Sequence, residues 1–222
     1  MKKFLYLLIF FTVSLSAQNS KSKYWLDPEG REISREEKNF LMDKYPDNSL
    51  AFRKTKDSGY VYQFNAPKYS TYKVDYKIIK TEIEKITNRV YSDSTIFLIN
   101  FNYLDDKCSD WFLIKLSSEI FNNIKTFIEP LKKGIEYKSN VIYLALFENG
   151  IVLKNKPKSK KEYFFSDQNN FFRSNLFLNP TLCGSFGLIK PNGETLIRNG
   201  EYRPDNMYEH LKPKIWDLIF QQ

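Results

Sequence analysis

The feature that most constrains the fold is a nearly continuous apolar run at residues 95–101, Thr-Ile-Phe-Leu-Ile-Asn-Phe. A strand exposed on one face alternates apolar and polar residues, whereas such a run is typical of a strand buried on both faces. A second run at residues 140–147 has the same character. The two runs predict an α/β fold in which helices cover both faces of a central sheet.

Helical patterns flank these two strands. Apolar residues at helical spacing predict an amphipathic helix over about residues 73–91 and a long helix over residues 109–132. Further along the chain, the aromatic residues 163–165 predict a short third strand, and residues 170–177 predict a short helix.

The last third of the chain contains a hairpin signal. Residues 184–189 and 195–198 are apolar enough to be strands, and Lys-Pro-Asn-Gly separates them. Pro191 presets the backbone for a turn and Gly193 accepts a positive φ, so a tight hairpin is expected.

A final helix is expected after the hairpin. Asp205 is placed to cap it, because its side chain can accept from the first free amides. Pro213 lies inside the apolar pattern of this helix and predicts a kink or a break.

The N-terminus has the pattern of a secretory signal. Lys2 and Lys3 precede an apolar stretch over residues 4–13, and small residues follow up to Ala17. The alternative is a membrane anchor, but about ten apolar residues are too few to span a bilayer. We therefore expect cleavage of residues 1–17 and export to the periplasm or the outside of the cell, with no stable membrane span afterwards.

Residues 18–70 are expected to form an N-terminal extension of the main domain. Ser34 and Glu37 have the spacing of a capping box, in which each side chain accepts from the other's amide, so a helix should follow to about Lys44. Residues 60–64, Tyr-Val-Tyr-Gln-Phe, predict a strand.

The chain is mildly basic. Its formal charge is +8, and loss of the signal lowers this to about +6. The densest basic run, Lys154–Lys161, contains a proline and no apolar residue. A solvated loop is the favoured interpretation and a binding patch is the alternative. Export argues against a nucleic-acid partner.

Cys108 and Cys183 are the only cysteines in the chain. Cys108 follows the first buried strand, and two thiols that lie close together in an oxidising compartment are expected to pair. Three roles remain open: a structural disulfide, two buried free thiols that act as small apolar groups, or a redox-active pair or single reactive thiol.

The order of strand, cysteine-bearing loop, long helix, strand, short helix, hairpin and closing helix resembles the thioredoxin-like superfamily. The resemblance rests on residues 95–108, 183–189 and 190–193. It implies a thioredoxin-like central sheet with flanking helices, over residues 71–222.

The chain departs from that family at its active site. The family carries two cysteines three residues apart. Here the position three residues before Cys108 holds Asp105, and the position three residues after it holds Trp111. Counting back from Gly193, the family's cis-proline falls at Gly184, with Cys183 immediately before it. The resemblance therefore implies that Cys108 and Cys183 are neighbours and are the candidate disulfide.

Other candidate residues carry weaker signals. His210, the only histidine, lacks metal-ligand spacing to other residues and is expected at the surface. Asp105 and Asp106 are capable of binding a cation or acting as a carboxylate pair, but a solvated turn is favoured. No cofactor is expected.

The favoured function is an exported, redox-degenerate thioredoxin-like protein that binds an unidentified protein partner or has a structural role. The alternative is a thiol-disulfide oxidoreductase with Cys108 as the nucleophile and Cys183 as the resolving thiol. A third hypothesis is a basic surface, Lys154–Lys161, that binds an acidic partner.

Overall fold

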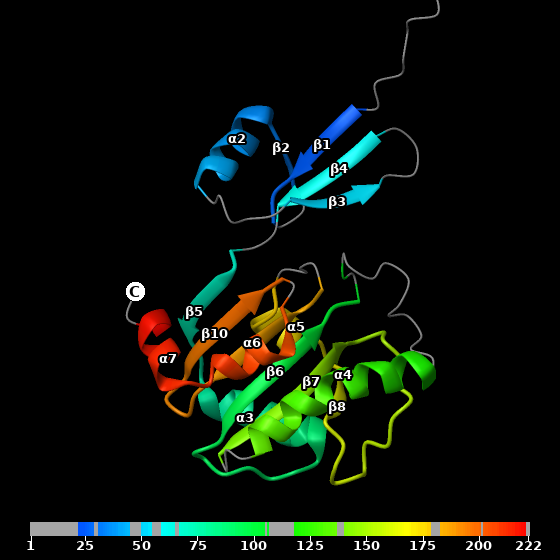
Figure 1. Cartoon of the computed structure of the whole chain (residues 1–222), viewed down its shortest axis with the longest axis vertical. Coiled ribbons are helices and arrows are strands. Elements are labelled where there is room, and N and C mark those ends of the chain that lie inside the picture. The colour runs from blue at the N-terminus through cyan, green and yellow to red at the C-terminus, as the bar shows by residue number, and fades with distance from the viewer. Residues whose placement is uncertain are drawn as a thin grey trace, which may run out of the picture.

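The structure is a computed structural model (Figure 1). It describes residues 22–28, 31–44, 50–54, 59–64, 67–104, 106, 118–136, 140–178, 183–200 and 202–220. The predicted signal segment lies outside these ranges. Within the described part of the chain, no helix is long and apolar enough to cross a membrane.

A six-stranded sheet forms the larger part of the molecule. Its strands stand in the order β5-β10-β9-β6-β7-β8. Their bounds are β5 Tyr69–Lys73, β6 Ile96–Asn102, β7 Val141–Glu148, β8 Phe164–Asp167, β9 Ser185–Ile189 and β10 Glu194–Asn199. β6, β7 and β8 are parallel, whereas β9 runs antiparallel to β6, and β10 pairs antiparallel with both β9 and β5.

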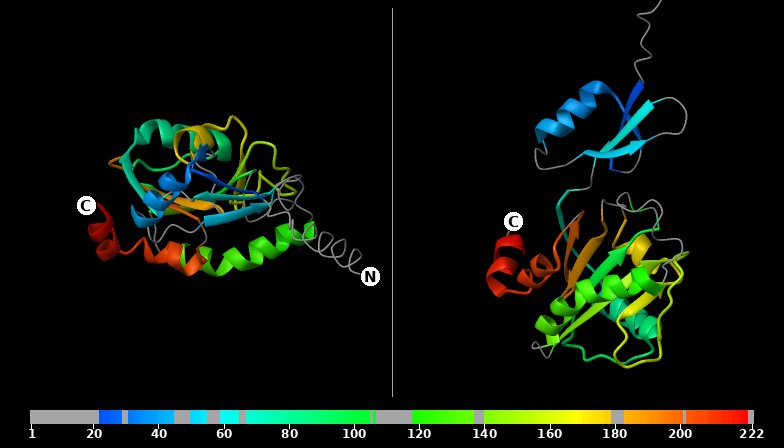
Figure 2. Two further views of the ribbon diagram at one scale, coloured as in Figure 1. Left: turned by 90° about the horizontal axis from the view of Figure 1, so that it is seen from above. Right: turned by 45° about the vertical axis from the view of Figure 1, so that its right-hand side comes forward.

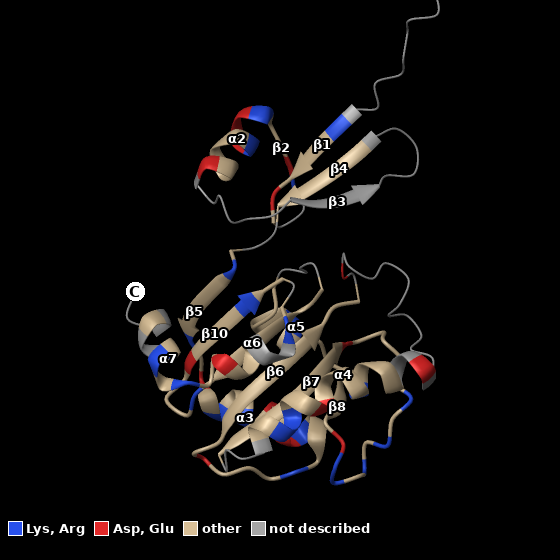
Figure 3. Cartoon of the chain, in the orientation of Figure 1, with Lys and Arg blue, Asp and Glu red and all other residues tan. Residues whose placement is uncertain are grey.

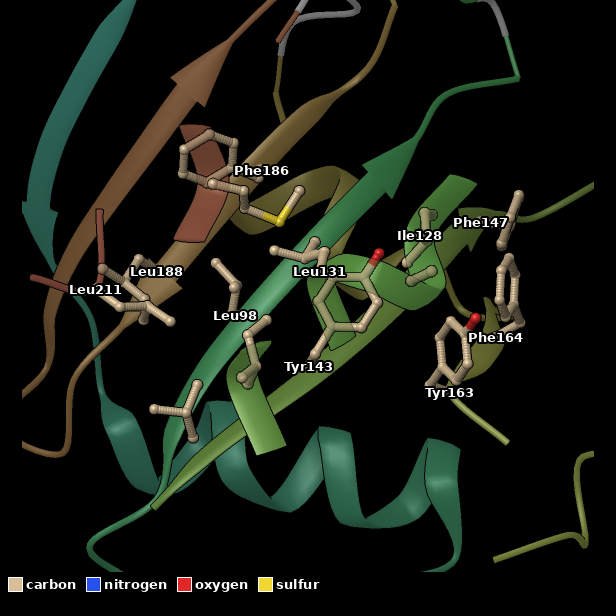
Figure 4. Packing of buried hydrophobic residues seen from close by; sticks show 14 of the residues in the cluster. Leu98, Ile128, Leu131, Tyr143, Phe147, Tyr163, Phe164, Phe186, Leu188 and Leu211 are labelled. Atoms are coloured by element: carbon tan, nitrogen blue, oxygen red, sulfur yellow. The ribbon is translucent and has the colours of Figure 1, made fainter. Parts of the chain in front are cut away.

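Helices cover both faces of this sheet, as the apolar run predicted. Leu98 of β6 packs in one cluster with Leu131 of α4 (Ser118–Glu136) and Met207 of α6 (Pro204–Glu209). Figure 4 shows Leu98 and Leu131 within this cluster. Its neighbour Ile99 belongs to a second cluster with Ile79 of α3 (Tyr76–Thr87) and with α5 (Phe171–Asn175). Successive side chains of a strand point to opposite faces, so Phe97, Leu98, Ile99 and Phe101 of β6 are each buried on one face or the other.

The predicted hairpin and the broken final helix are both present. The Gly193 amide donates to the Lys190 carbonyl at 2.9 Å, and Gly193 has φ +84°, with the Val74 carbonyl oxygen only 2.3 Å from where a Cβ would lie. The closing helix is divided into α6 and α7 (Pro213–Phe220), with Pro213 at the start of the second part. The predicted cap was wrong: Arg203 is the N-cap residue, and Pro204 opens the helix ahead of Asp205.

The strand β5 was not predicted from the sequence. Residues 73–91 were expected to be one helix, but α3 begins at Tyr76, where the side chain of Asp75 accepts from the amide of Lys77 at 2.9 Å. β5 is an edge strand whose residues are mostly exposed, so its sequence lacks an apolar face. Such strands carry little signal in the hydrophobic pattern.

The N-terminal residues form a second sheet, coloured blue to cyan in Figure 2. Its strands stand in the order β2-β1-β4-β3. Its elements are β1 Ser22–Leu26, β2 Glu32–Ile33, α2 Arg35–Lys44, β3 Leu50–Lys54 and β4 Gly59–Phe64. The capping box is confirmed, because the Glu37 amide donates to Ser34 Oγ at 3.1 Å and the Ser34 amide donates to Glu37 Oε2 at 2.8 Å.

Candidate functional site

The site begins in the centre of the large sheet, at the end where β6 finishes and β9 starts. Phe101 of β6 pairs with Ser185, the first residue of β9, and Cys183 stands just before that strand. Cys108, which follows β6 in the sequence, lies outside the described residues. The antiparallel pairing thus brings the segment of Cys183 to the end of the strand that leads to Cys108.

A buried carboxylate links these two segments directly. Asp106 is 5% exposed, and its Oδ1 accepts the backbone amide of Cys183 at 3.0 Å. The predicted solvated turn was wrong for Asp106, while Asp105 lies outside the described residues. Because Asp106 is two residues before Cys108, this bond brings the two cysteine-bearing segments together.

The backbone at Cys183 is unusual. Cys183 and Gly184 both adopt positive φ values, 61° and 79°. A Cβ on Gly184 would lie 2.9 Å from the Phe101 carbonyl oxygen, so glycine is needed for the close approach to β6. The sulfur of Cys183 is engaged in a disulfide, and there is no free cysteine among the described residues.

Next to Cys183 and Gly184, three neutral side chains form a chain of hydrogen bonds. The Tyr103 hydroxyl donates to Ser185 Oγ at 3.0 Å, and Ser185 Oγ donates to Asn199 Oδ1 at 3.3 Å. Burial raises the pKa of Tyr103 well above its usual range, so its hydroxyl stays protonated near neutral pH. Tyr103 can therefore orient Ser185, but it cannot serve there as a base.

An ion pair ties the same two segments together farther from the cysteines. Glu148 Oε2 accepts the Leu104 amide at 2.9 Å, and Glu148 Oε1 lies 3.2 Å from Arg173 Nε. Arg173 Nη1 in turn donates to the carbonyls of Phe177, at 2.9 Å, and Leu178. Glu148 and Arg173 thus connect the chain leaving β6 with the chain leading toward Cys183.

His210 does not belong to this site. The prediction that it lies at the surface was wrong: it is 7% exposed, and its Nε2 lies 3.0 Å from the Tyr69 hydroxyl. Its ring also packs edge-on against Phe186 at 5.0 Å. These contacts give His210 a packing role between β5, β9 and the closing helices. No group of three or more potential metal ligands occurs in the described ranges.

Two hollows lie away from the cysteine site. The larger, about 400 Å³, is lined by parts of α3, β8 and residues 151–157. The smaller, about 230 Å³, lies at the start of β7. Neither is lined by Cys183 or Asp106, so neither serves the disulfide.

The directions of four central strands decide the fold. Parallel β6 and β7 are connected through α4, β9 returns antiparallel beside β6, and β10 runs antiparallel beside β9 ahead of the closing helices. The chain has a thioredoxin-like fold. This confirms the resemblance inferred from the sequence. At the position expected for the thioredoxin-like cis-proline stand Cys183 and Gly184, and every peptide bond within the described residues is trans.

Neither a protein-family model nor a curated protein sequence matches the chain. Among solved structures, it is similar to a secreted disulfide oxidoreductase of Mycobacterium tuberculosis that is homologous to E. coli DsbE. That match has 10% identity and a TM-score of 0.30, and it covers 52% of this chain and 79% of the other.

A second similar structure is a candidate thiol-disulfide oxidoreductase from Bacteroides vulgatus. It has 12% identity and a TM-score of 0.29, and the match covers 58% of this chain and 73% of the other. The order and the directions of the strands define the thioredoxin-like fold of this chain.

Proposed function

We propose that Cys108 and Cys183 form a disulfide, and that this thioredoxin-like chain is a binding or structural module without dithiol catalysis. One observation carries the proposal: Cys183 is disulfide-bonded, and its amide is held by Asp106, two residues before the only other cysteine. The bridge would join the two segments that meet at the end of β6.

The surroundings of the bridge argue against a reactive thiol. A dithiol cycle at one loop needs a second cysteine three residues away, and the sequence has Asp105 and Trp111 at those positions. The carboxylate of Asp106 is buried beside the Cys183 backbone. A nearby negative charge disfavours a thiolate and so lowers the nucleophilicity of the site at neutral pH.

Mass spectrometry of the alkylated protein tests the bridge. Without reductant we expect no alkylation and a mass two hydrogens below that of the dithiol form. With reductant we expect two alkylated thiols. Alkylation of both cysteines in the absence of reductant would exclude the bridge.

An insulin-reduction assay tests the absence of catalysis. We expect no turnover above that of dithiothreitol alone. The competing function is a thiol-disulfide oxidoreductase, which is favoured by the partial exposure of Cys183. That enzyme would show turnover which disappears in Cys108→Ser, and this result would replace the non-catalytic assignment.

Export is the remaining part of the proposal. The charged, apolar and small residues of 1–17 support removal of a signal and a periplasmic or secreted location. N-terminal sequencing of the mature protein should then find a start at or near Gln18. Recovery of a chain that begins at Met1 in the cytoplasm would contradict this assignment.

A further inference from the structure

A basic hollow lies at the opposite end of β7 from the cysteine site. It measures about 230 Å³, and its wall comes from four parts of the chain: the turn after α3, the second half of α4, the start of β7, and the end of the connection between β7 and β8. Four cationic residues line it, Arg89, Lys132, Lys160 and Lys161. Figure 3 shows the lysines of the connection between β7 and β8 in blue.

The charge of this hollow is not balanced by its one acidic residue. Glu162 lines it, but its Oε1 accepts the amides of Tyr163 and Phe164, both at 3.1 Å. Its Oε2 lies 3.3 Å from Lys125 Nζ, which is not part of the lining. Among the described residues, neither Lys160 nor Lys161 pairs with a carboxylate. The hollow therefore has an excess of positive charge.

The backbone that carries the two lysines is held in place. Arg89 Nη2 donates to the carbonyl oxygens of Ser159 and Glu162, both at 2.8 Å, and its guanidinium lies 5.3 Å from the centre of the Phe165 ring. The Glu162 amide also donates to the Ser159 carbonyl at 3.0 Å. Lys160 and Lys161 thus project from a fixed turn, which lowers the entropic cost of binding a ligand.

Aromatic side chains complete the wall. Lys132 Nζ lies 5.1 Å from the centre of the Tyr163 ring, and the Tyr163 hydroxyl donates to Glu129 at 3.0 Å. Tyr143 stands next to Tyr163, as Figure 4 shows, with 5.7 Å between the ring centres. The rings supply an apolar surface beside the cations, and Lys132 is positioned where the two meet.

We propose that this hollow binds a small ligand through a tetrahedral oxyanion, a phosphate or sulfate group. A cluster of cations from separate segments favours a dianion over a singly charged carboxylate. Lysine ammonium groups offer three rotatable donors each, which suits an oxyanion. One water occupies about 30 Å³, so a hollow of about 230 Å³ also has room for such a group and a small organic part. The inference does not depend on the disulfide.

Titration with inorganic phosphate, sulfate and acetate at constant ionic strength tests the site. Two-dimensional NMR should show saturable shifts of the amides at residues 159–163 with phosphate and sulfate, and much weaker effects with acetate. Tighter binding of phosphate would indicate a phosphate ester as the ligand, and tighter binding of sulfate a sulfate ester. Absence of saturable shifts with both dianions would overturn the proposal.

A matched pair of variants separates a built site from general charge. Lys160→Gln with Lys161→Gln and Lys154→Gln with Lys158→Gln remove the same charge from the same exposed connection, but only the first pair lines the hollow. We expect the first double variant to bind phosphate about tenfold or more weakly, as for loss of a charge-assisted hydrogen bond, and the second to change less than about twofold. Equal weakening in both would overturn the proposal. Thermal unfolding of both variants should match that of the unmodified protein, because all four lysines are exposed.

Discussion

At the scale of single residues, Asp106 gives the cysteine site its clearest test. Replacing it by alanine leaves the Cys183 amide, now bonded at 3.0 Å, without its buried acceptor. An unsatisfied buried donor costs about 1–3 kcal/mol, so Asp106→Ala should lower the free energy of unfolding by that amount. Urea unfolding of the oxidised protein measures it. Asp106→Asn keeps an acceptor oxygen and should lose less; equal losses in the two variants would contradict this role.

Gly184 provides a test of the backbone at the same site. Its φ of 79° and the 2.9 Å approach of a Cβ to the Phe101 carbonyl oxygen both oppose any side chain. Gly184→Ala should therefore destabilise the protein by roughly 1–3 kcal/mol. The matched control is Gly134→Ala in α4, where the nearest atoms of the Tyr208 ring lie 3.8 Å away. Since alanine favours the helix, the control should keep or gain stability in the same thermal unfolding assay.

Asp167 predicts a pH dependence of stability. It is fully buried, and burial raises its pKa despite the hydrogen bond from the Arg173 amide at 2.9 Å. A raised pKa in the folded state means that this group's stabilising contribution is complete below the unfolded pKa of about 3.9 and is lost as pH rises through the folded value. The stability of Asp167→Asn relative to the unmodified protein should therefore increase from acid to neutral pH. Urea midpoints measured at several pH values would contradict this if the difference stayed constant.

Two residues show the limit of local sequence patterns. Asp106 follows a strand in a polar stretch, and His210 lies in a mixed helical stretch, so both were assigned to the surface. Both are buried because distant segments cover them: Cys183 bonds to Asp106, and Tyr69 and Phe186 contact His210. Contacts over 77 and 141 residues of sequence leave no periodic signal that a single sequence would reveal.

At the scale of elements, the Glu148–Arg173 pair connects the end of β7 to the short helix α5. Glu148→Gln should weaken the charge-assisted hydrogen bond that the Leu104 amide donates to this side chain at 2.9 Å, and it should remove the charged partner of Arg173. We expect a loss of about 1–3 kcal/mol, since both side chains are mostly buried. Hydrogen exchange at the Leu104 amide should accelerate in this variant. Unchanged exchange at Leu104 would contradict the role of the pair.

The elements themselves differ in how well the sequence predicts them. β6 and β7 were predicted because both of their faces are buried, which favours apolar residues at most positions. The hairpin at 190–193 was predicted because Gly193 needs a positive φ. β5 was missed because an exposed edge strand needs only backbone pairing with β10, which many sequences can provide.

At the scale of the whole molecule, the two cysteines enclose a long stretch of the thioredoxin-like domain. The proposed bridge closes a separation of 183 − 108 = 75 residues that contains α4, β7, β8 and α5. It would therefore restrict the unfolded chain more than it changes the folded one. Asp106 and the Glu148–Arg173 pair already bring the two segments together by noncovalent contacts. The fold is thus expected to persist without the bridge, at lower stability.

This expectation gives the last prediction. Reducing the Cys108–Cys183 bridge should lower the free energy of unfolding by about 4 kcal/mol in the chain-entropy model, which corresponds to a melting temperature lower by roughly 10 °C. Thermal unfolding with and without reductant measures the difference. The double variant Cys108→Ser, Cys183→Ser is the control: it should melt near the reduced protein and be insensitive to reductant. Equal melting temperatures for oxidised and reduced protein would show that the bridge does not stabilise this fold.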